Sequence, residues 1–195
     1  MTDRLDEYLN LLLKWNRPAG LTAFEGREEA LAKGVLPSLA AEPWLRAGWR
    51  VIDAGSGGGF PAIPLALKRP DLRWTLVEPN VAKAAFLREA ARQLALETEV
   101  VEATLEALLA GEQRQWDAAT IRGLRLRKGP LRRLVRALSP GGRILVWSAG
   151  ERATGYRLWL EEIGLAVRPV PTGQHGLVLL SGDVPRGTPE ATPMR

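Results

Sequence analysis

The chain lacks cysteine altogether and contains a single histidine, His175. Without cysteine there are no disulfides, no thiolate nucleophile and no cysteine-bound zinc. One histidine also excludes a metal site built from a histidine cluster. We therefore expect a protein without a metal centre.

Long apolar runs are absent as well, since none reaches the roughly 18 residues that a helix needs to cross a bilayer. The N-terminal residues include Asp3, Asp6 and Glu7, where a secretion signal would carry positive charge. We expect a cytoplasmic protein with no membrane partner.

What the chain does have is enough apolar sequence for one domain: 195 residues, of which 46% are hydrophobic. The net charge of +5 favours a polyanionic partner, although many basic proteins bind no nucleic acid. We expect a monomer. Its three parts are an N-terminal helical extension (1–46) packed on the core, a ligand-binding domain (47–183) and a disordered tail (184–195).

The pattern of apolar residues changes from helical to alternating strand and helix near residue 47. A helix is predicted over 4–15, ended by Pro18 and Gly20, and short helical pieces over 25–46. Beyond them we predict strands at 50–53, 74–77, 99–102, 116–121 and 143–147, a turn at 140–142, and helices at 61–68, 80–94, 105–110, 127–138 and 152–163. The last strands, 165–169 and 176–180, have no helix between them. The prediction is an α/β, Rossmann-like, doubly wound sheet that is mostly parallel, with an antiparallel C-terminal strand.

A glycine-rich turn between the first strand and its helix is the strongest motif. Asp53, Gly55, Gly57 and Gly59 match the acidic-x-Gly-x-Gly-x-Gly pattern of class I methyltransferases. The dinucleotide fingerprint would need Gly or Ala where Phe60 stands, which disfavours a nicotinamide enzyme. Glycines let a ligand lie against bare backbone, so the motif predicts a cofactor site rather than a plain turn.

Glu78 ends the second strand about twenty residues later, where an acidic side chain binds ribose hydroxyls. Asp53 is expected to position the loop or to face the amino-acid end of a cofactor. Only Phe60, Trp15 and Trp147 lie where a base could stack.

Residues 122–143 carry eight basic residues and no acidic one. Most charge runs are solvated faces, but those faces usually mix both signs. Guanidinium groups bind phosphates in bidentate fashion, so we predict an RNA-contacting surface. Its residues are Arg125, Arg127, Lys128, Arg132 and Arg133.

The chain resembles the glucose-inhibited division protein B family, methyltransferases of 16S ribosomal RNA. The resemblance rests on Leu12-Leu13-Lys14-Trp15-Asn16 with Leu21-Thr22, on residues 51–67 with their Phe-Pro-Ala-Ile-Pro run, on residues 76–88 and on Pro140-Gly141-Gly142. It implies methyl transfer from S-adenosylmethionine to N7 of a guanine in ribosomal RNA or the small ribosomal subunit.

The resemblance also implies residue roles. Gly55 and Phe60 would line the cofactor pocket, Glu78 would hold the ribose, and Leu105 with Glu106 would frame the adenine. Arg122 would lie at the cofactor and the target base, as a positioning residue in a reaction without a general base.

The departures from the family pattern lie in the substrate half. Gly20 replaces an Asn, Gly34 and Pro37 replace a His and an Asp, Ile121-Arg122-Gly123 replaces Ser-Arg-Ala, and Trp147-Ser148 replaces Lys-Gly. The alternatives are therefore a methyltransferase for another RNA, a small molecule or a protein, and a non-catalytic cofactor-binding paralogue.

Overall fold

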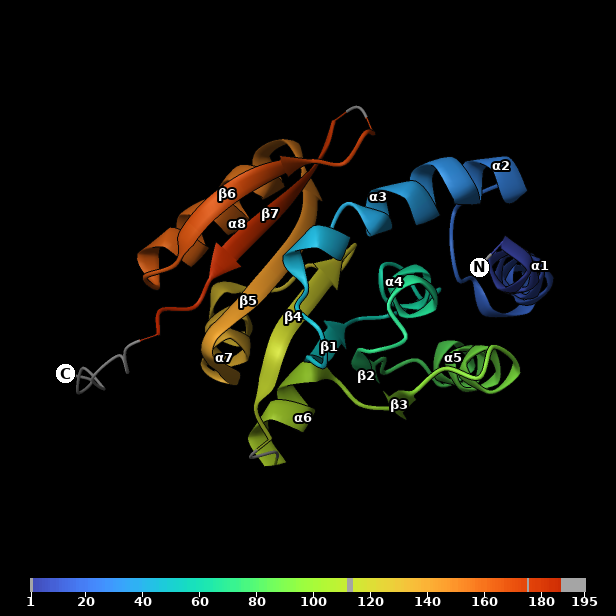
Figure 1. The fold of residues 1–195 in the computed structure, drawn as a ribbon, viewed down its shortest axis with the longest axis horizontal. Helices are drawn as coiled ribbons and strands as arrows, with labels where there is room; N and C mark the ends of the chain where they lie inside the picture. The colour runs from blue at the N-terminus through green and yellow to red at the C-terminus, as the bar shows by residue number, and fades with distance from the viewer. Residues whose placement is uncertain (1, 112–113, 175, 187–195) are drawn as a thin grey trace.

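A computed structural model describes residues 2–111, 114–174 and 176–186. A seven-stranded sheet crosses the molecule in the order β3-β2-β1-β4-β5-β7-β6 (Figure 1). The strands are β1 (Arg50–Ala54), β2 (Arg73–Val77), β3 (Thr98–Val101), β4 (Trp116–Arg122), β5 (Leu138–Ala149), β6 (Ala166–Pro171) and β7 (Leu177–Asp183). Neighbouring strands from β3 to β5 are parallel, and β7 is antiparallel to both β5 and β6. The predicted fold class is therefore confirmed.

Alternation along the strands gives the sheet two apolar faces. In β1, Val51 belongs to one buried cluster, whereas Ile52 and Ala54 belong to the other. The first cluster includes side chains of α1 (Thr2–Ala19), α4 (Ala62–Lys68) and α5 (Val81–Gln93). The second includes side chains of α6 (Leu105–Gly111), α7 (Lys128–Arg136) and α8 (Gly150–Glu162). Burial on both faces explains why the central strands β1 and β4 are mostly apolar.

Between α1 and β1 the chain forms short helical pieces, as the sequence predicts. They are α2 (Arg27–Glu29), a π-helix (Ala30–Val35), α3 (Leu36–Leu39) and a 3₁₀ turn (Glu42–Trp44). Among the described helices, none is both long enough and apolar enough to cross a membrane.

The structure corrects the predicted end of the first helix. α1 runs past Pro18 to Ala19, because a proline in the last turn removes only one terminal hydrogen bond. Gly20 then ends the helix with a φ of 57° and donates its N–H to the carbonyl of Asn16 at 2.9 Å.

The predicted turn at 140–142 lies inside β5. Trp116 pairs with Leu138 and Ala118 pairs with Arg143, so residues 139–142 bulge opposite residue 117. Gly142 permits this approach, since a Cβ there would lie 2.6 Å from the carbonyl oxygen of Asp117. Turn-forming residues therefore produce a bulge within a paired strand.

The predicted tail begins too early, because residue 184 still pairs with the sheet. Val184 exchanges hydrogen bonds with Gly141 and Gly142 at 3.1 and 2.9 Å. The disorder predicted for residues 187–195 concerns positions outside the described ranges.

Candidate functional site

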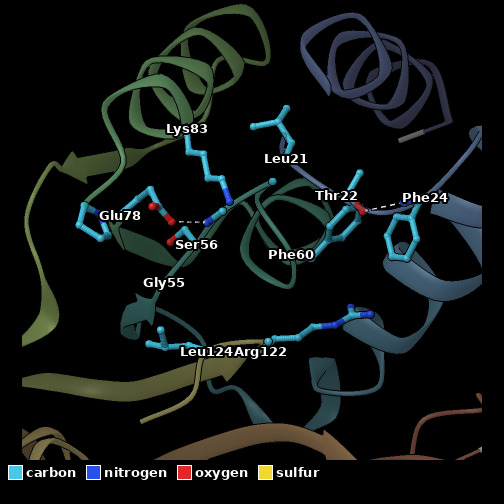
Figure 2. A pocket seen from close by; sticks show the side chains of 14 residues that line it. Leu21, Thr22, Phe24, Gly55, Ser56, Phe60, Glu78, Lys83, Arg122 and Leu124 are labelled. Carbon is cyan, nitrogen blue, oxygen red and sulfur yellow. Dashed lines mark hydrogen bonds between the residues drawn. The ribbon is translucent and has the colours of Figure 1, made fainter. Parts of the chain in front are cut away.

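A cavity of about 430 Å³ opens at the carboxyl ends of β1 and β4 (Figure 2). The connections from β1 lead to β2 on one side and from β4 to β5 on the other, so this point is the topological switch where open α/β sheets bind ligands. Its lining comes from four parts of the chain: the segment after α1 (Leu21, Thr22, Phe24), the glycine turn (Gly55–Gly58 and Phe60), the residues beyond β2 (Glu78, Pro79, Lys83) and those at the end of β4 (Arg122, Gly123, Leu124).

The glycine turn has a backbone that other residues adopt with strain. Gly55, Gly57 and Gly59 have φ values of 73°, 51° and 89°. A Cβ on Gly59 would also lie 2.4 Å from the side chain of Ile63, and one on Gly58 would lie 3.1 Å from the carbonyl oxygen of Leu21. Positive φ angles and close packing therefore account for these glycines, of which Gly55, Gly57 and Gly58 line the cavity.

Tyr8, in α1, holds this turn from behind. Its hydroxyl donates to the carbonyl of Gly58 at 2.6 Å, and its ring packs edge-on against Phe60 with centroids 5.6 Å apart. Burial raises the pKa of the Tyr8 hydroxyl well above its usual value, so the group stays protonated and can donate. The N-terminal helix thus supports the turn directly.

Glu78 is nearly buried at the end of β2 and ties the turn to α5. One carboxylate oxygen accepts from the backbone N–H of Gly57 at 2.9 Å, and the other from that of Asn80 at 3.0 Å. Asn80 in turn caps α5 by accepting from the N–H of Lys83 at 3.1 Å. Each Glu78 oxygen keeps a lone pair for a further donor.

Asp53 lies beneath the turn, 1% exposed. Its Oδ1 accepts from the hydroxyl of Thr120 at 2.6 Å, and its Oδ2 has no hydrogen-bond partner among the described residues. Burial raises the pKa of this carboxyl to about 7, against the lowering effect of the Thr120 hydroxyl. The carboxyl beneath the turn therefore has one oxygen without a partner in the described part of the chain, and Asp53 itself does not line the cavity.

Arg122 lines the cavity but most of its donors are engaged with the N-terminal extension. Nη1 donates to the carbonyl of Gly34 at 2.7 Å and to the hydroxyl of Ser38 at 2.8 Å, while Nη2 donates to the carbonyl of Lys33. The guanidinium also lies 5.7 Å from the ring centroid of Phe60. Burial lowers the pKa of Arg122 to about 10, so it is still charged at neutral pH. The residue docks the extension at the mouth of the site, a contact that the sequence did not predict.

Other predicted residues lie away from the cavity. Leu105 is buried in the second apolar cluster and Glu106 is exposed, and neither lines the cavity. Of the expected stacking residues, Trp147 is buried and donates to the carbonyl of Pro37 at 2.7 Å, and Trp15 packs on Phe86. Only Phe60 reaches the cavity.

The basic residues divide into two groups. Arg125 and Arg127 are exposed just after the cavity-lining residues 123–124, whereas Arg132 and Arg133 are exposed on α7. Lys128 forms an ion pair with Glu162 of α8. Residues 122–143 contain no acidic residue, but the fold brings Glu162 next to Lys128.

Sequence reasoning missed several residues of the cavity wall: Thr22, Phe24, Ser56, Pro79, Lys83 and Leu124. Pro79 and Lys83 follow Glu78 closely, which was an available signal. Thr22 was part of the family resemblance without a role, and Phe24 gave no signal, because only the packing of α1 brings this segment next to the glycine turn.

Solved structures with the same fold include several methyltransferases. A precorrin-6y C5,15-methyltransferase from Geobacter metallireducens gives a TM-score of 0.65 at 17% identity, covering 83% of this chain and 90% of that one. A 16S rRNA methyltransferase of T. thermophilus, in complex with AdoMet and guanosine, gives 0.63 at 22% identity, covering 84% and 44%. The [4+2]-cyclase SpnF also gives 0.65 at 19% identity, covering 78% and 81%. The fold by itself therefore does not determine the reaction.

Sequence relatives are more specific. A ribosomal RNA small subunit methyltransferase G from Xanthomonas campestris is 42% identical over 139 residues, which are 71% of this chain and 64% of the relative. One from Neisseria gonorrhoeae is 43% identical over 107 residues, 54% of this chain and 52% of the relative. The chain spans less than two thirds of these relatives. The family model described as rRNA small subunit methyltransferase G matches residues 1–157, from α1 into α8. The chain belongs to this family, GidB.

Proposed function

We propose that this chain binds S-adenosylmethionine in the cavity at the ends of β1 and β4 and methylates N7 of a guanine in small-subunit ribosomal RNA. The observation that carries the proposal is the pairing of the glycine turn with the Glu78 carboxylate at the switch point, in a chain of this family. The proposed substrate is this RNA, either free or within the small ribosomal subunit. We further propose that the protein acts in the cytoplasm and as a monomer.

The residues present fit this cofactor. The glycine turn would let the amino-acid end of the cofactor lie against backbone. Asp53, buried directly beneath this turn with an unpartnered Oδ2, would attract the positive charge of the cofactor. The free lone pairs of Glu78 would accept from the ribose hydroxyls of the cofactor. Pro79 and Leu124, which line the cavity where Leu105 and Glu106 do not, provide apolar contact for the adenine.

The cofactor supplies a methyl group on a positively charged sulfur. Guanine N7 has a lone pair and loses no proton on methylation, so the chain needs no general base. What the protein contributes is alignment of N7 with the methyl group and exclusion of water. The extension supports both, since Leu21, Thr22 and Phe24 form one wall of the cavity.

The test is transfer of radiolabelled methyl groups from S-adenosylmethionine to small-subunit rRNA and to particles that lack the modification, with tRNA and bulk protein as controls. We expect label in that rRNA, mapped to a single guanine N7. Glu78→Gln, which removes the charge that accepts from ribose, should weaken cofactor binding and lower transfer. Label confined to tRNA or protein, or cofactor binding with no transfer at all, contradicts the proposal.

A further inference from the structure

We propose that Phe24 is the platform on which the target base stacks. The inference rests on the proposed function and adds a substrate-positioning residue to the same site. Phe24 belongs to the loop between α1 and α2, is half-buried, and lines the cavity together with the glycine turn.

Phe24 lies at the opposite end of the cavity from Glu78 (Figure 2). Glu78 marks the ribose end of the proposed cofactor site, and Lys83 reaches toward the turn between the two ends. Phe60, Thr22 and Phe24 come together at the far end. A base that approaches the methyl group from outside therefore meets this aromatic end, while the nucleoside part of the cofactor does not.

The two phenylalanine rings support each other. Phe24 and Phe60 pack edge to face, with centroids 5.8 Å apart and an interplanar angle of 72°. An edge-on contact occupies the edge of one ring and leaves ring surface available for stacking. Gly34 makes room for both rings, because a Cβ there would lie 2.6 Å from Phe60 and 3.0 Å from Phe24.

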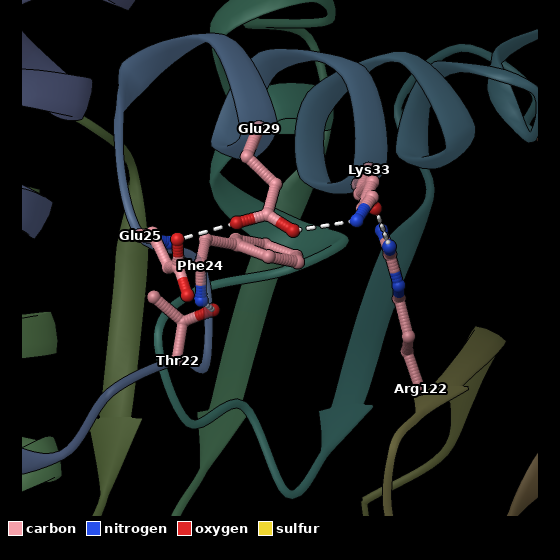
Figure 3. A network of polar contacts seen from close by, with 6 residues as sticks. All are labelled: Thr22, Phe24, Glu25, Glu29, Lys33 and Arg122. Carbon is pink, nitrogen blue, oxygen red and sulfur yellow. Dashed lines mark hydrogen bonds and ion pairs between the residues drawn. The ribbon is translucent and has the colours of Figure 1, made fainter.

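A chain of polar contacts fixes the loop on both sides of Phe24 (Figure 3). The Phe24 N–H donates to the hydroxyl of Thr22 at 3.2 Å, and the Glu25 N–H donates to the Glu29 carboxylate at 2.8 Å. That carboxylate also pairs with Lys33 at 2.5 Å, and the carbonyl of Lys33 accepts from Arg122. The pKa of Glu29 is lowered by these contacts, the hydrogen bond from Lys33 being the largest.

A ring held in this way suits an unstacked base. Proteins that recognise single-stranded RNA stack its bases on phenylalanine and similar side chains. Enzymes that modify a base must also take it out of its stack or receive it unpaired, and a fixed ring replaces the lost stacking partner. Because the Thr22 hydroxyl and the Glu29 carboxylate already hold the loop, little further ordering is needed when the base arrives.

The experiment compares Phe24→Leu and Phe24→Tyr with wild type in the rRNA methylation assay. Loss of one base–aromatic stack should lower kcat/KM for RNA about 5- to 150-fold in Phe24→Leu. Phe24→Tyr keeps the ring and should stay close to wild type. The affinity for S-adenosylhomocysteine and the melting temperature should be similar in all three proteins. Trp159→Leu is a matched control, because it removes a half-buried ring in edge contact with Tyr156, on α8.

The outcomes separate the two proposals. If wild type methylates no guanine of the rRNA, the proposed function fails, and this inference fails with it. If wild type methylates rRNA and Phe24→Leu has the wild-type kcat/KM, only the stacking role is overturned. Equal losses of RNA turnover and of S-adenosylhomocysteine affinity, or equal losses in Phe24→Leu and Phe24→Tyr, also overturn it, because they assign the residue to loop structure.

Discussion

Asp53 combines deep burial with a pKa raised to about 7. In the unfolded chain this carboxyl titrates near its ordinary pKa of 3.8. The folded protein therefore holds the proton more tightly, and its stability falls as the pH rises from about 4 to about 7. A bound cation next to Oδ2 would reverse the preference and favour the charged form.

Asp53→Asn should remove this dependence. Compared with the variant, wild type should lose about 2 to 3 kcal/mol of unfolding free energy between pH 5 and pH 8, since each pKa unit is worth 1.36 kcal/mol. Urea unfolding of both proteins at the two pH values measures the difference. Cofactor binding by wild type should strengthen from pH 6 to pH 8. If the difference in unfolding free energy between the two proteins does not change with pH, Asp53 titrates normally.

At the scale of single elements, the π-helix and α3 need hydrogen-bond donors from outside the helix to satisfy their carbonyls. Pro37 carries no N–H and so cannot donate to a carbonyl of the preceding turn. Arg122 instead donates to the carbonyls of Lys33 and Gly34. Trp147 of β5 donates to the carbonyl of Pro37. Side chains of the sheet therefore satisfy the irregular helix, and they dock it over the cavity.

Gly34→Ala tests whether this helix is shaped by the rings beneath it. Alanine is the better helix former by about 1 kcal/mol, but its Cβ would lie 2.6 Å from Phe60. We expect a net destabilisation of about 1 to 3 kcal/mol from overpacking and weaker RNA turnover. Gly155→Ala in α8 is the matched control, because nothing lies within 4 Å of its Cβ; it should stabilise the protein by about 0.5 to 1 kcal/mol. Chemical denaturation measures both, and equal shifts would contradict the steric account.

Most elements could be predicted because apolar periodicity and glycine turns are local signals. The ends of β1, β2 and β4 fall within one residue of their predicted limits. The bulge at Pro140–Gly142 could not be predicted, because the same residues form turns wherever no strand pairs with them. The π-helix could not be predicted either, since it depends on donors from Arg122, 84 or more residues away.

At the scale of the whole molecule, the candidate site could be predicted only in part. The glycine turn and Glu78 follow each other closely in sequence, and they do line one cavity. The wall contributed by Thr22 and Phe24 required the packing of α1 against α4 and α5. Arg122 lines the cavity, and its hydrogen bonds to the extension arise from tertiary contacts that no local signal announces.

The fold also places the exposed arginines at different distances from the cavity. β4 and β5 are parallel, so α7 carries the chain from the carboxyl edge of the sheet back to the amino edge. Arg125 and Arg127 lie before α7, beside the cavity, and Arg136 ends it at the far edge. Phosphate contacts are therefore expected near the first pair.

Replacing both Arg125 and Arg127 with Ala should weaken RNA binding and lower its salt dependence by about one unit of slope per residue. Arg136→Ala removes a charge that is also exposed, at the other edge, and should change binding much less. Filter binding over a series of salt concentrations measures the affinity and the slope. Equal effects of Arg136→Ala and of the single Arg125→Ala would indicate a uniform charge effect instead of a directed surface.

The order of the strands has a consequence for synthesis of the protein. β7 is inserted between β5 and β6, and Asp183 at its end forms an ion pair with Arg143 of β5. While a ribosome is still translating residues 150–176, the outer edge of β5 has no partner, and β6 has no strand to join. The nascent chain can build the half of the sheet that holds the glycine turn early, yet it closes the other half only once residues 177–183 have emerged. Unpaired strand edges invite association with other chains, so this interval is when the polypeptide most needs protection by chaperones.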